Sequence, residues 1–467
     1  MGSEFNRRHF LHGCGVGLAR IALAAMAEED ALCAGATLES KEPHFPGKAK
    51  SIIYLFMEGG PSQLDLYQHK PKLIGMDGQP TPASLLAGKK FAFMERMSAP
   101  KLYGSRREFS RHGQSGHYFS SLLPNLARRA DDLAFVHSMV TTNVNHSPAM
   151  VFAHTGGMIS GRPSLGAWLV YGLGSESKDL PAFVAMTSGP RGPRNGNDIW
   201  GSGFLPTHYQ GVPFLNAKSP IFHLNSPDGV TQARQRRAID TIRDLNQQRL
   251  AVTGDNEIET RIASYELAFR MQTSAPELTE LTKESQATLD LYGAQPGKPS
   301  FANNCLLARR LVERGVRCVQ VYHTDWDHHA GIEKGLDKIC PEVDRASAAL
   351  ITDLKQRGLL DSTLVVWGGE FGRTPMSEGD GKNPGRNHQI DGFTVWLAGG
   401  GVRGGMTVGE TDDLGFQSVN ELVEVHDLHA TILHCFGLDH TKLTYNSQGR
   451  PFRLTDVAGK VVRKLIS

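Results

Sequence analysis

The stretch "YHTDWDHH", residues 322 to 329, is the strongest candidate metal-binding motif of this sequence. It directly follows a short apolar run, and in open α/β sheets the carboxyl ends of strands deliver side chains to the usual ligand-binding position. Asp325 and His329 are four residues apart, so a carboxylate oxygen and an imidazole nitrogen converge on one cation if the segment turns helically. Asp327 and His328 offer a competing choice, and a solvated polar loop is the alternative to a metal site.

A second candidate ligand is His388, in "GRNHQ" on a Gly/Pro-rich loop. A lone histidine in a loop is usually a hydrogen-bonding residue. Together with Asp325 and His329, however, it completes a set of one carboxylate and two histidines, which is a common zinc arrangement with one position open for substrate. We therefore expect a divalent metal on these three residues, with zinc as the expected ion.

Two further carboxylates stand where apolar runs end. Glu58 follows "SIIYLFM" and precedes Gly59 and Gly60, while Glu370 lies in "WGGEFGRTP". Paired glycines allow close approach of the backbone at the rim of a site, but they suit an ordinary tight turn equally well. Taken alone, Glu370 is open to three interpretations: a metal ligand, a catalytic acid, or the charge that ends a strand.

The stretch "TTNVNHSPAMVFAHTGG" offers a different chemistry. His146, Ser147 and Pro148 stand where a loop is expected to turn into a helix, so the exposed amides there could cradle an anion. The alternative is that Ser147 caps a helix whose first residue is Pro148.

The elements that must position these residues are short runs rich in β-branched and aromatic residues. The runs cover residues 51–57, 133–138, 316–322, 362–368 and 393–399. Helix-periodic stretches between them end at Gly315 and Gly437. Continuous apolar strands alternating with helices predict an α/β fold, with a mostly parallel central sheet covered by helices on both faces. Residues from about 225 to 295 are charged and helix-periodic, which predicts a helical insertion.

Composition argues against two classes of partner. The chain has 467 residues with 50 Lys and Arg against 48 Asp and Glu, so no field of one sign exists to attract nucleic acid or a membrane surface. Beyond the N-terminus, no stretch approaches about 18 uninterrupted apolar residues, so no membrane span is expected in the mature protein. The four cysteines outside the N-terminal segment lack C-x-x-C spacing and indicate no zinc knuckle.

The N-terminus "NRRHFLHGCGVGLARIALAAMA" resembles a twin-arginine export signal. Arg7 and Arg8 precede a Gly/Ala-rich apolar stretch that is followed by small-residue cleavage sites. We assign residues 1–36 to this signal and residues 45–467 to the folded domain. The implied partner is the twin-arginine export machinery, and the implied location is periplasmic or secreted. An ordinary amphipathic helix is the alternative, favoured by Arg20 within the apolar stretch.

Seven motifs, in order, resemble the bacterial family called domain of unknown function 1501. They are "FMEGGPSQLDLY", "NHSPAMVFAHTG", "RPSLGAWLVYGLGS", "HTDWDHH", "GGEFGRTP", "GRNHQ" and "VHDLHATILHCFGLDHTKLTY". The resemblance implies an alkaline phosphatase-like fold, from a superfamily whose members cleave phosphate or sulfate esters with a metal pair. It also implies Glu58 as the first acidic ligand, Asp325 with His329 as an Asp-x-x-x-His pair, and His388 as the late histidine.

Two departures from the superfamily pattern affect the implied mechanism. Where the superfamily has Asp-His, this chain has Glu370 and Phe371, so one imidazole ligand is absent. A second metal site would then rest on Glu58 and Glu370, an all-oxygen pair suited to magnesium, calcium or manganese, or it would be empty. Where sulfatases have the cysteine that becomes formylglycine, this chain has His146 before Ser-Pro.

These features together predict an exported metal-dependent hydrolase of phosphate or sulfate esters, acting on a small-molecule or polymer substrate. His146 would act as a nucleophile, as a fourth ligand, or as the acid that protonates the leaving group. Arg373 would clamp an oxyanion or serve only as a salt-bridge partner. The rival hypothesis is a catalytically degenerate family member that acts as a secreted binding or assembly module. A purely structural metal would need a fourth protein ligand and no open position.

Overall fold

The computed structural model describes residues 38–467, apart from 90, 93–99, 216–229, 256 and 379–381. The predicted export signal lies outside the described residues. Within them, no helix is both long enough and apolar enough to cross a membrane.

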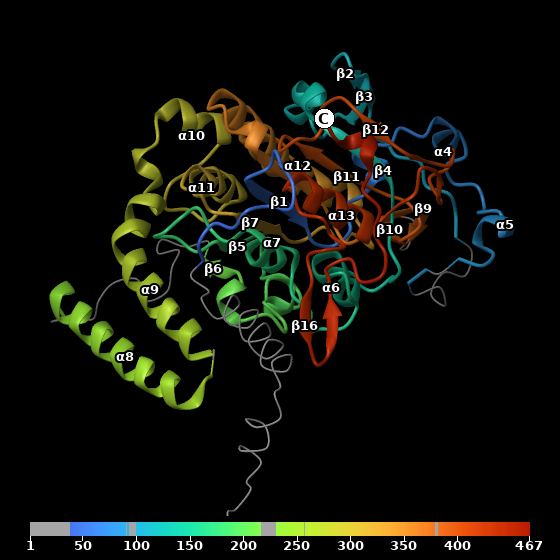
Figure 1. Ribbon diagram of the computed structural model, residues 1–467. Helices are drawn as coiled ribbons and strands as arrows, with labels where there is room; N and C mark the ends of the chain where they lie inside the picture. The colour runs from blue at the N-terminus through green and yellow to red at the C-terminus, as the bar shows by residue number, and fades with distance from the viewer. Residues whose placement is uncertain (1–37, 90, 93–99, 216–229, 256, 379–381) are drawn as a thin grey trace, which may run out of the picture.

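A nine-stranded sheet forms the centre of the molecule (Figure 1). Its strand order is β12-β4-β11-β8-β1-β7-β5-β6, and β15 also pairs with β4. The strands are β1 (Ser51–Met57), β4 (Ala134–Val140), β5 (Phe183–Ser188), β6 (Val212–Phe214), β7 (Cys318–His323), β8 (Thr363–Gly368), β11 (Phe393–Ala398), β12 (Thr407–Val408) and β15 (Val423–Glu424). Among these nine strands, β11 alone runs opposite to the rest, pairing antiparallel with β4 and β8. The mostly parallel sheet confirms the predicted fold class.

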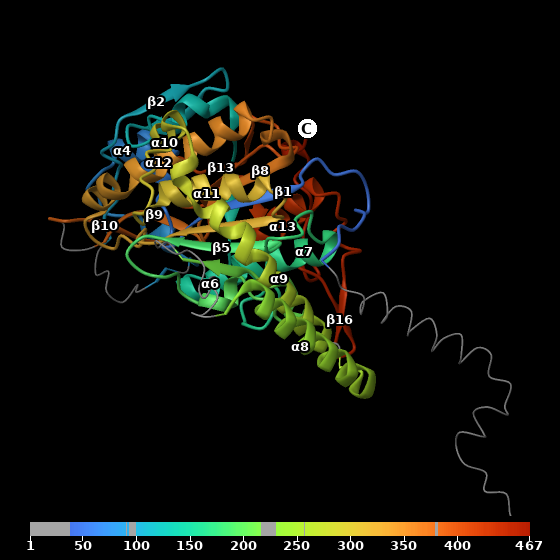
Figure 2. The same cartoon turned by 90° about the vertical axis from the view of Figure 1, so that its left-hand side faces the viewer.

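Helices cover both faces of this sheet (Figure 2), so β1 is buried over its whole length. Ile53 and Leu55 belong to one core, and Tyr54 and Phe56 belong to the other. The first core is shared with α10 (Gln286–Tyr292), α11 (Phe301–Glu313), α12 (Ile332–Gln356) and the 3-10 helix η2 (Leu126–Asp132). The second is shared with α6 (His146–Thr155), α7 (Leu165–Leu173) and α13 (Val425–Cys435). Burial on both faces is the reason that the strand is apolar without alternation.

The site is positioned by three adjacent parallel strands, β8, β1 and β7. Their carboxyl ends meet at one edge of the sheet, where Glu370, Glu58 and the segment 324–329 follow them. An antiparallel hairpin of β9 (Gly372–Glu378) and β10 (Gly385–Gln389) packs against that segment. The backbone N–H of Arg386 donates to the carbonyl of His328 at 3.0 Å, which ties the hairpin to the segment after β7.

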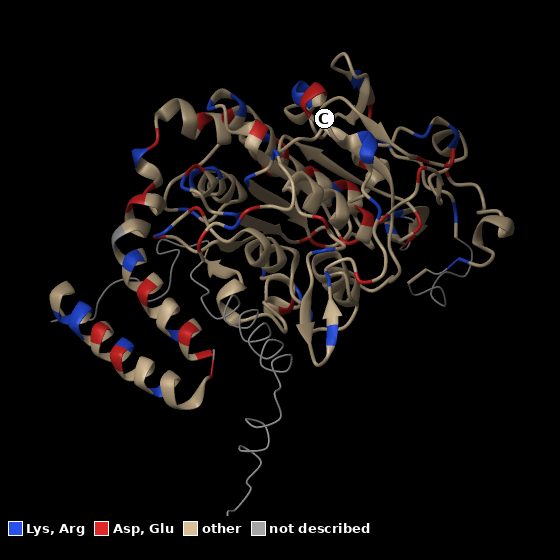
Figure 3. Ribbon diagram, viewed as in Figure 1, with Lys and Arg blue, Asp and Glu red and all other residues tan. Residues whose placement is uncertain are grey.

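Within the stretch of about 225–295 that we expected to be a helical insertion, two long helices, α8 (Gln232–Thr253) and α9 (Glu257–Thr279), extend away from the sheet (Figures 1 and 2). Charged residues of both signs are mixed along the pair (Figure 3), as expected for a solvated surface. Arg236 on α8 donates to Glu266 on α9 at 2.8 Å, and α9 packs against α11.

Apart from further 3-10 helices, the remaining described elements are short and lie around the sheet. They are α3 (Gln63–Leu66), α4 (Pro71–Gly75), α5 (Ala83–Leu86), the pair β2 (Phe109–His112) and β3 (His117–Ser120), the pair β13 (Glu410–Thr411) and β14 (Ser418–Asn420), and the pair β16 (Tyr445–Ser447) and β17 (Arg450–Phe452). The four cysteines among the described residues are buried free thiols.

Candidate metal centre

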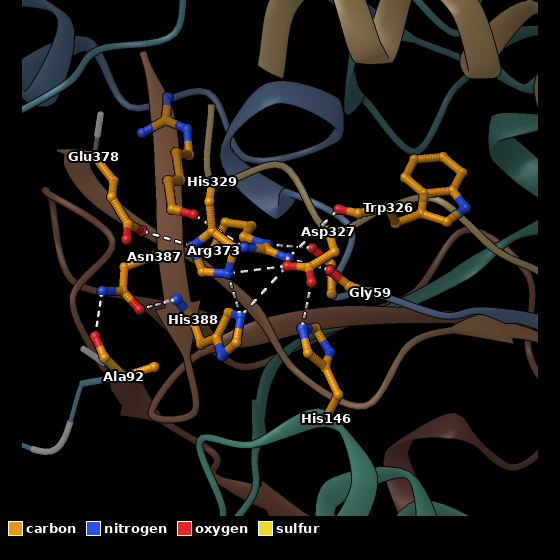
Figure 4. A network of polar contacts seen from close by, with 12 residues as sticks. Gly59, Ala92, His146, Trp326, Asp327, His329, Arg373, Glu378, Asn387 and His388 are labelled. Atoms are coloured by element: carbon orange, nitrogen blue, oxygen red, sulfur yellow. Dashed lines mark hydrogen bonds and ion pairs between the residues drawn. The ribbon is translucent and has the colours of Figure 1, made fainter. Parts of the chain in front are cut away.

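Four side chains from three segments far apart in the sequence meet at the edge of the sheet where β1, β7 and β8 end (Figure 4). They are His146, Asp327, His329 and His388, and their ligand atoms all lie within 4.8 Å of one another. Nε2 of His146 lies 3.0 Å from Oδ2 of Asp327. Nε2 of His329 and Nε2 of His388 lie 3.1 Å and 3.5 Å from Oδ1 of the same residue. Three imidazoles therefore surround one carboxylate.

Each of these imidazoles is held by its other ring nitrogen, Nδ1. The partners are Glu370 Oε1 for His146 (2.6 Å), Glu378 Oε2 for His329 (2.7 Å) and the Val144 carbonyl for His388 (2.5 Å). Carboxylates and carbonyls only accept hydrogen bonds, so we assign the proton of each neutral ring to Nδ1. Each Nε2 then carries a lone pair, the tautomer that a metal ligand needs, and the partners of Nδ1 fix the orientation of the ring.

The Nε2 atoms are arranged for a shared cation. Those of His329 and His388 are 3.0 Å apart, so two lone pairs would face each other unless a proton or a cation lies between them. Nε2 of His146 is buried and, apart from its 3.0 Å ion-pair contact with Asp327, has no polar partner among the described residues. Donor atoms about 2.1 Å from one ion lie about 3.4 Å apart in a tetrahedron. The donor set therefore fits a divalent cation.

Burial and carboxylates act in opposite directions on these imidazoles. Burial disfavours the charged form of His329, but its contacts with two carboxylates outweigh this and raise its pKa to about 9. The same balance raises the pKa of His146, whereas burial prevails at His388 and lowers its pKa to about 4. Burial also opposes ionisation of Asp327, but the three imidazoles and Arg373 hold its pKa well below the usual range. Without a metal, the cluster thus holds protons that a cation would displace.

His146 is the first residue of α6, and His388 lies on the buried strand β10. His146 thus stands where a loop turns into a helix, as expected, whereas Ser147 is not the cap and His388 is not on a loop. The N-cap of α6 is Asn145, which has an extended backbone, and not Ser147, whose hydroxyl accepts a hydrogen bond from Asn195 at 2.6 Å. The predicted loop around His388 is a strand because β10 pairs with β9, which local sequence does not reveal.

Asp325, a predicted ligand, lies outside the cluster. Its side chain is 49% exposed, and its nearest cationic partner is Nζ of Lys338 at 3.9 Å. The segment after β7 is not helical and Asp325 has a φ of +84°, so spacing by four residues does not bring it onto His329. Asp327 takes its place, so the aspartate weighed as the competing choice is the one that joins the histidines.

Glu58 and Glu370 are both buried, but donors from the protein already contact them. Glu370 accepts from the backbone N–H of Gly59 at 3.0 Å as well as from His146. Glu58 accepts from the guanidinium group of Arg194 at 2.9 Å and forms an ion pair with that of Arg191 at 2.7 Å. These donors occupy the positions that a second cation on this carboxylate pair would need.

Arg373 is fully buried, and burial lowers its pKa. Its guanidinium donates to the carbonyls of Gly60 and Arg386, each at 2.9 Å, to Oδ1 of Asp327 at 2.7 Å, and to the carbonyl of Gly59 (Figure 4). The geometry fits a salt-bridge partner that holds Asp327 in place. A clamp for a substrate oxyanion, the other predicted role, would need exposed donors.

Phe371, where the resemblance led us to expect an imidazole, is also buried. Its ring centroid lies 4.8 Å from that of His146 and 4.5 Å from that of His388. The side chain therefore forms an apolar wall that packs two of the candidate ligands.

Three residues of the site were missed from the sequence: Glu378, Arg191 and Arg194. Glu378 stands at the end of β9 and reaches His329 only through the pairing of the hairpin, so it has no local signal. The arginines lie in "PRGPRNG", within a Gly/Pro-rich stretch typical of a loop at the rim of a sheet. Two arginines so close together in such a loop were the signal that could have identified them.

Comparison with known proteins identifies the family of this chain. No curated protein matches the sequence. The chain is weakly similar to the lipoteichoic acid synthase LtaP from Listeria monocytogenes, with 9% identity, a TM-score of 0.38, and coverage of 93% of this chain and 80% of that chain. It is similar to the phosphonate monoester hydrolase SpPMH from Silicibacter pomeroyi with 12% identity, a TM-score of 0.33, and coverage of 83% of this chain and 73% of that chain. It is similar to the sulfatase PsFucS1 from Pseudoalteromonas sp. with 12% identity, a TM-score of 0.34, and coverage of 85% of this chain and 68% of that chain. Likenesses this weak assign no role to any residue here. Residues 49–466 match the family described as protein of unknown function (DUF1501), so this chain belongs to the DUF1501 family.

Proposed function

We propose that this protein is a metal-dependent hydrolase of phosphate or sulfate esters. The observation that carries the proposal is the set of three Nε2 atoms directed at Asp327, each in a ring that a second partner orients. A divalent cation bound there would polarise a substrate oxygen and lower the pKa of a bound water. The ester class is suggested by the exposed Arg194 beside Asp327 and by the motif resemblance.

The cluster is open on one side. The side chains of Asp327 and His329 are 22% and 30% exposed, whereas that of His388 is 3% exposed. We propose that His146 is the fourth ligand, because its Nδ1 is held by Glu370 and its Nε2 faces Asp327. An ion with five or six ligands would then keep a position for substrate on the open side.

The ligand count also supports a second candidate. A strictly four-coordinate zinc would be closed by His146, Asp327, His329 and His388, as in structural sites. The protein would then be a binding or assembly module stabilised by metal. In either case the N-terminal sequence supports export by the twin-arginine machinery, to the periplasm or outside the cell.

Metal content tests the common part of both candidates. We expect the wild-type protein to hold one divalent ion per chain by elemental analysis, and Asp327→Asn and His388→Ala to retain less than about a tenth of it, because each removes a ligand. Asp325→Asn is the matched control, since the same change two residues away lies outside the cluster. If Asp327→Asn keeps its metal, the proposed site is wrong, and if Asp325→Asn loses it, Asp325 is a ligand after all.

Turnover separates the two candidates. Protein loaded with zinc, manganese or magnesium would be assayed on aryl phosphate and sulfate monoesters and on phosphate diesters. For a hydrolase, we expect kcat/KM on at least one class to fall by about 100-fold or more in Asp327→Asn, and to be unchanged in Asp325→Asn. A fully metal-loaded protein that hydrolyses none of these esters would instead support the structural metal.

A further inference from the structure

We propose that Arg191 and Arg194 form an oxyanion clamp beside the metal cluster, and that Glu58 anchors this clamp instead of binding a second metal. The clamp would take a tetrahedral oxyanion, the phosphate or sulfate group of the ester. This inference rests on the proposed function and assigns the residues that recognise the anionic group.

The carboxylate of Glu58 contacts both Arg191 and Arg194. Its side chain is fully buried, and its Oε1 forms an ion pair with Nη1 of Arg191 at 2.7 Å and accepts a hydrogen bond from Nη1 of Arg194 at 2.9 Å. Its Oε2 accepts from the backbone N–H of Arg194 at 3.1 Å. A buried carboxylate needs such partners, and here they are two guanidinium groups gathered on one oxygen.

The clamp adjoins the candidate metal directly. Nη2 of Arg194 lies 3.3 Å from Oδ2 of Asp327, the oxygen that Nε2 of His146 approaches at 3.0 Å. An anion held by Arg194 would therefore lie next to the metal-binding carboxylate.

The loop that carries the arginines is fixed to two sides of the site. The hydroxyl of Thr324, just after β7, donates to the carbonyl of Arg191 at 3.2 Å. Gly189 approaches the same threonine so closely, at a φ of +102°, that a Cβ there would lie 2.5 Å from its hydroxyl oxygen. At the other end, Asn195 donates to Ser147 in the first turn of α6. Such anchoring keeps the guanidinium groups in place before an anion binds.

The charge and the solvent exposure of Arg191 and Arg194 favour the binding of an anion. Asp327 beside Arg194 is also paired with Arg373, so three guanidinium groups face the two carboxylates of Glu58 and Asp327 and leave one positive charge in excess. The side chains of Arg191 and Arg194 are 39% and 34% exposed. Nε and Nη2 of Arg191 have no partner among the described residues. Arginine presents a planar fork of donors that matches phosphate and sulfate oxygens. The fully buried Arg373 offers no such exposed donors.

The test is direct binding of inorganic phosphate and inorganic sulfate, titrated separately into metal-loaded and metal-free protein by calorimetry at constant ionic strength. In Arg191→Gln and in Arg194→Gln we expect the Kd of the preferred ion to rise about tenfold. Arg129→Gln is the matched control: its side chain is 32% exposed, and it faces Asp132 on η2 at 3.8 Å. Arg194→Lys keeps the charge but loses the fork, so an intermediate Kd is expected. The ion that binds more tightly indicates the ester class.

The outcomes are distinguishable. If both glutamine variants bind the two ions as tightly as wild type, or if wild type binds neither ion, the clamp is overturned even if esters are hydrolysed. If the ions bind and the glutamine variants lose that binding while no ester is turned over, the clamp stands and the hydrolase proposal fails. Glu58→Gln should keep the wild-type metal content, and loss of one metal equivalent would show that Glu58 is a ligand.

Discussion

At the level of single residues, His329 illustrates how the cluster is prepared for a cation. Its Nδ1 donates to Glu378, and its Nε2 faces both Asp327 and His388. The carboxylates raise its pKa to about 9, so the metal-free ring is protonated at neutral pH. A bound cation would replace that proton and keep both carboxylate contacts.

Metal affinity should therefore depend on pH. Protonated His329 and His146 compete with the cation, since both have a raised pKa, so we expect affinity to rise with pH up to about 9 and to fall as the pH drops below it. Kd for manganese or zinc would be measured by chelator competition from about pH 6 to about pH 9. Glu378→Gln removes one source of the raised pKa, so its pH dependence should shift to lower pH. An affinity that does not change over this range would contradict the protonated cluster.

At the level of elements, the turn after β1 shows why the strand ends can lie so close together. Gly59 has a φ of +119°, and a Cβ there would lie 2.5 Å from the backbone nitrogen of Asp327. Its N–H also donates to Glu370. One glycine thus lets the loops after β1, β7 and β8 meet.

Gly59→Ala should accordingly damage both site and fold. The new methyl group must displace the backbone of Asp327, so we expect a loss of about 2–4 kcal/mol in the free energy of unfolding, from overpacking and left-handed strain. Metal content should fall as well. The control is Gly116→Ala, which has a φ of +68° but no atom within 4 Å of the added Cβ, and should cost only about 1 kcal/mol with no loss of metal. Urea unfolding and elemental analysis measure the two effects, and equal values for both variants would refute the close approach.

At the level of the whole molecule, the cluster links parts of the chain that are distant in sequence. His146 begins α6, Asp327 follows β7, and His388 belongs to β10. A bound cation would link α6, β10 and the segment after β7 through their side chains, so its binding energy would favour the folded state.

Removal of metal should consequently lower the melting temperature. Free metal at about 100 times Kd stabilises the folded state by about 2.7 kcal/mol, and chelation would remove this contribution. Scanning calorimetry at fixed pH, with and without chelator, would show the shift in wild type and in Asp325→Asn. Asp327→Asn should melt at the same temperature with and without chelator. A chelator effect of wild-type size in this variant would place the cation elsewhere.

The sequence by itself determined the class of fold and the edge of the sheet at which chemistry gathers. The apolar runs at 51–57, 362–368 and 393–399 match β1, β8 and β11 to within one residue at each end. They are recognisable because strands buried on both faces must be apolar throughout. The positions of Glu58 and Glu370 at strand ends follow from the same pattern.

Only the tertiary structure decided which side chains meet there. Asp327 and not Asp325 joins His329, because the direction of a side chain in an irregular segment depends on contacts with remote residues such as Arg373. Glu378 enters the site through strand pairing, which has no trace in local sequence. Spacing along the chain gives the distance between residues only where the backbone is regular, and the loops that build this site are not.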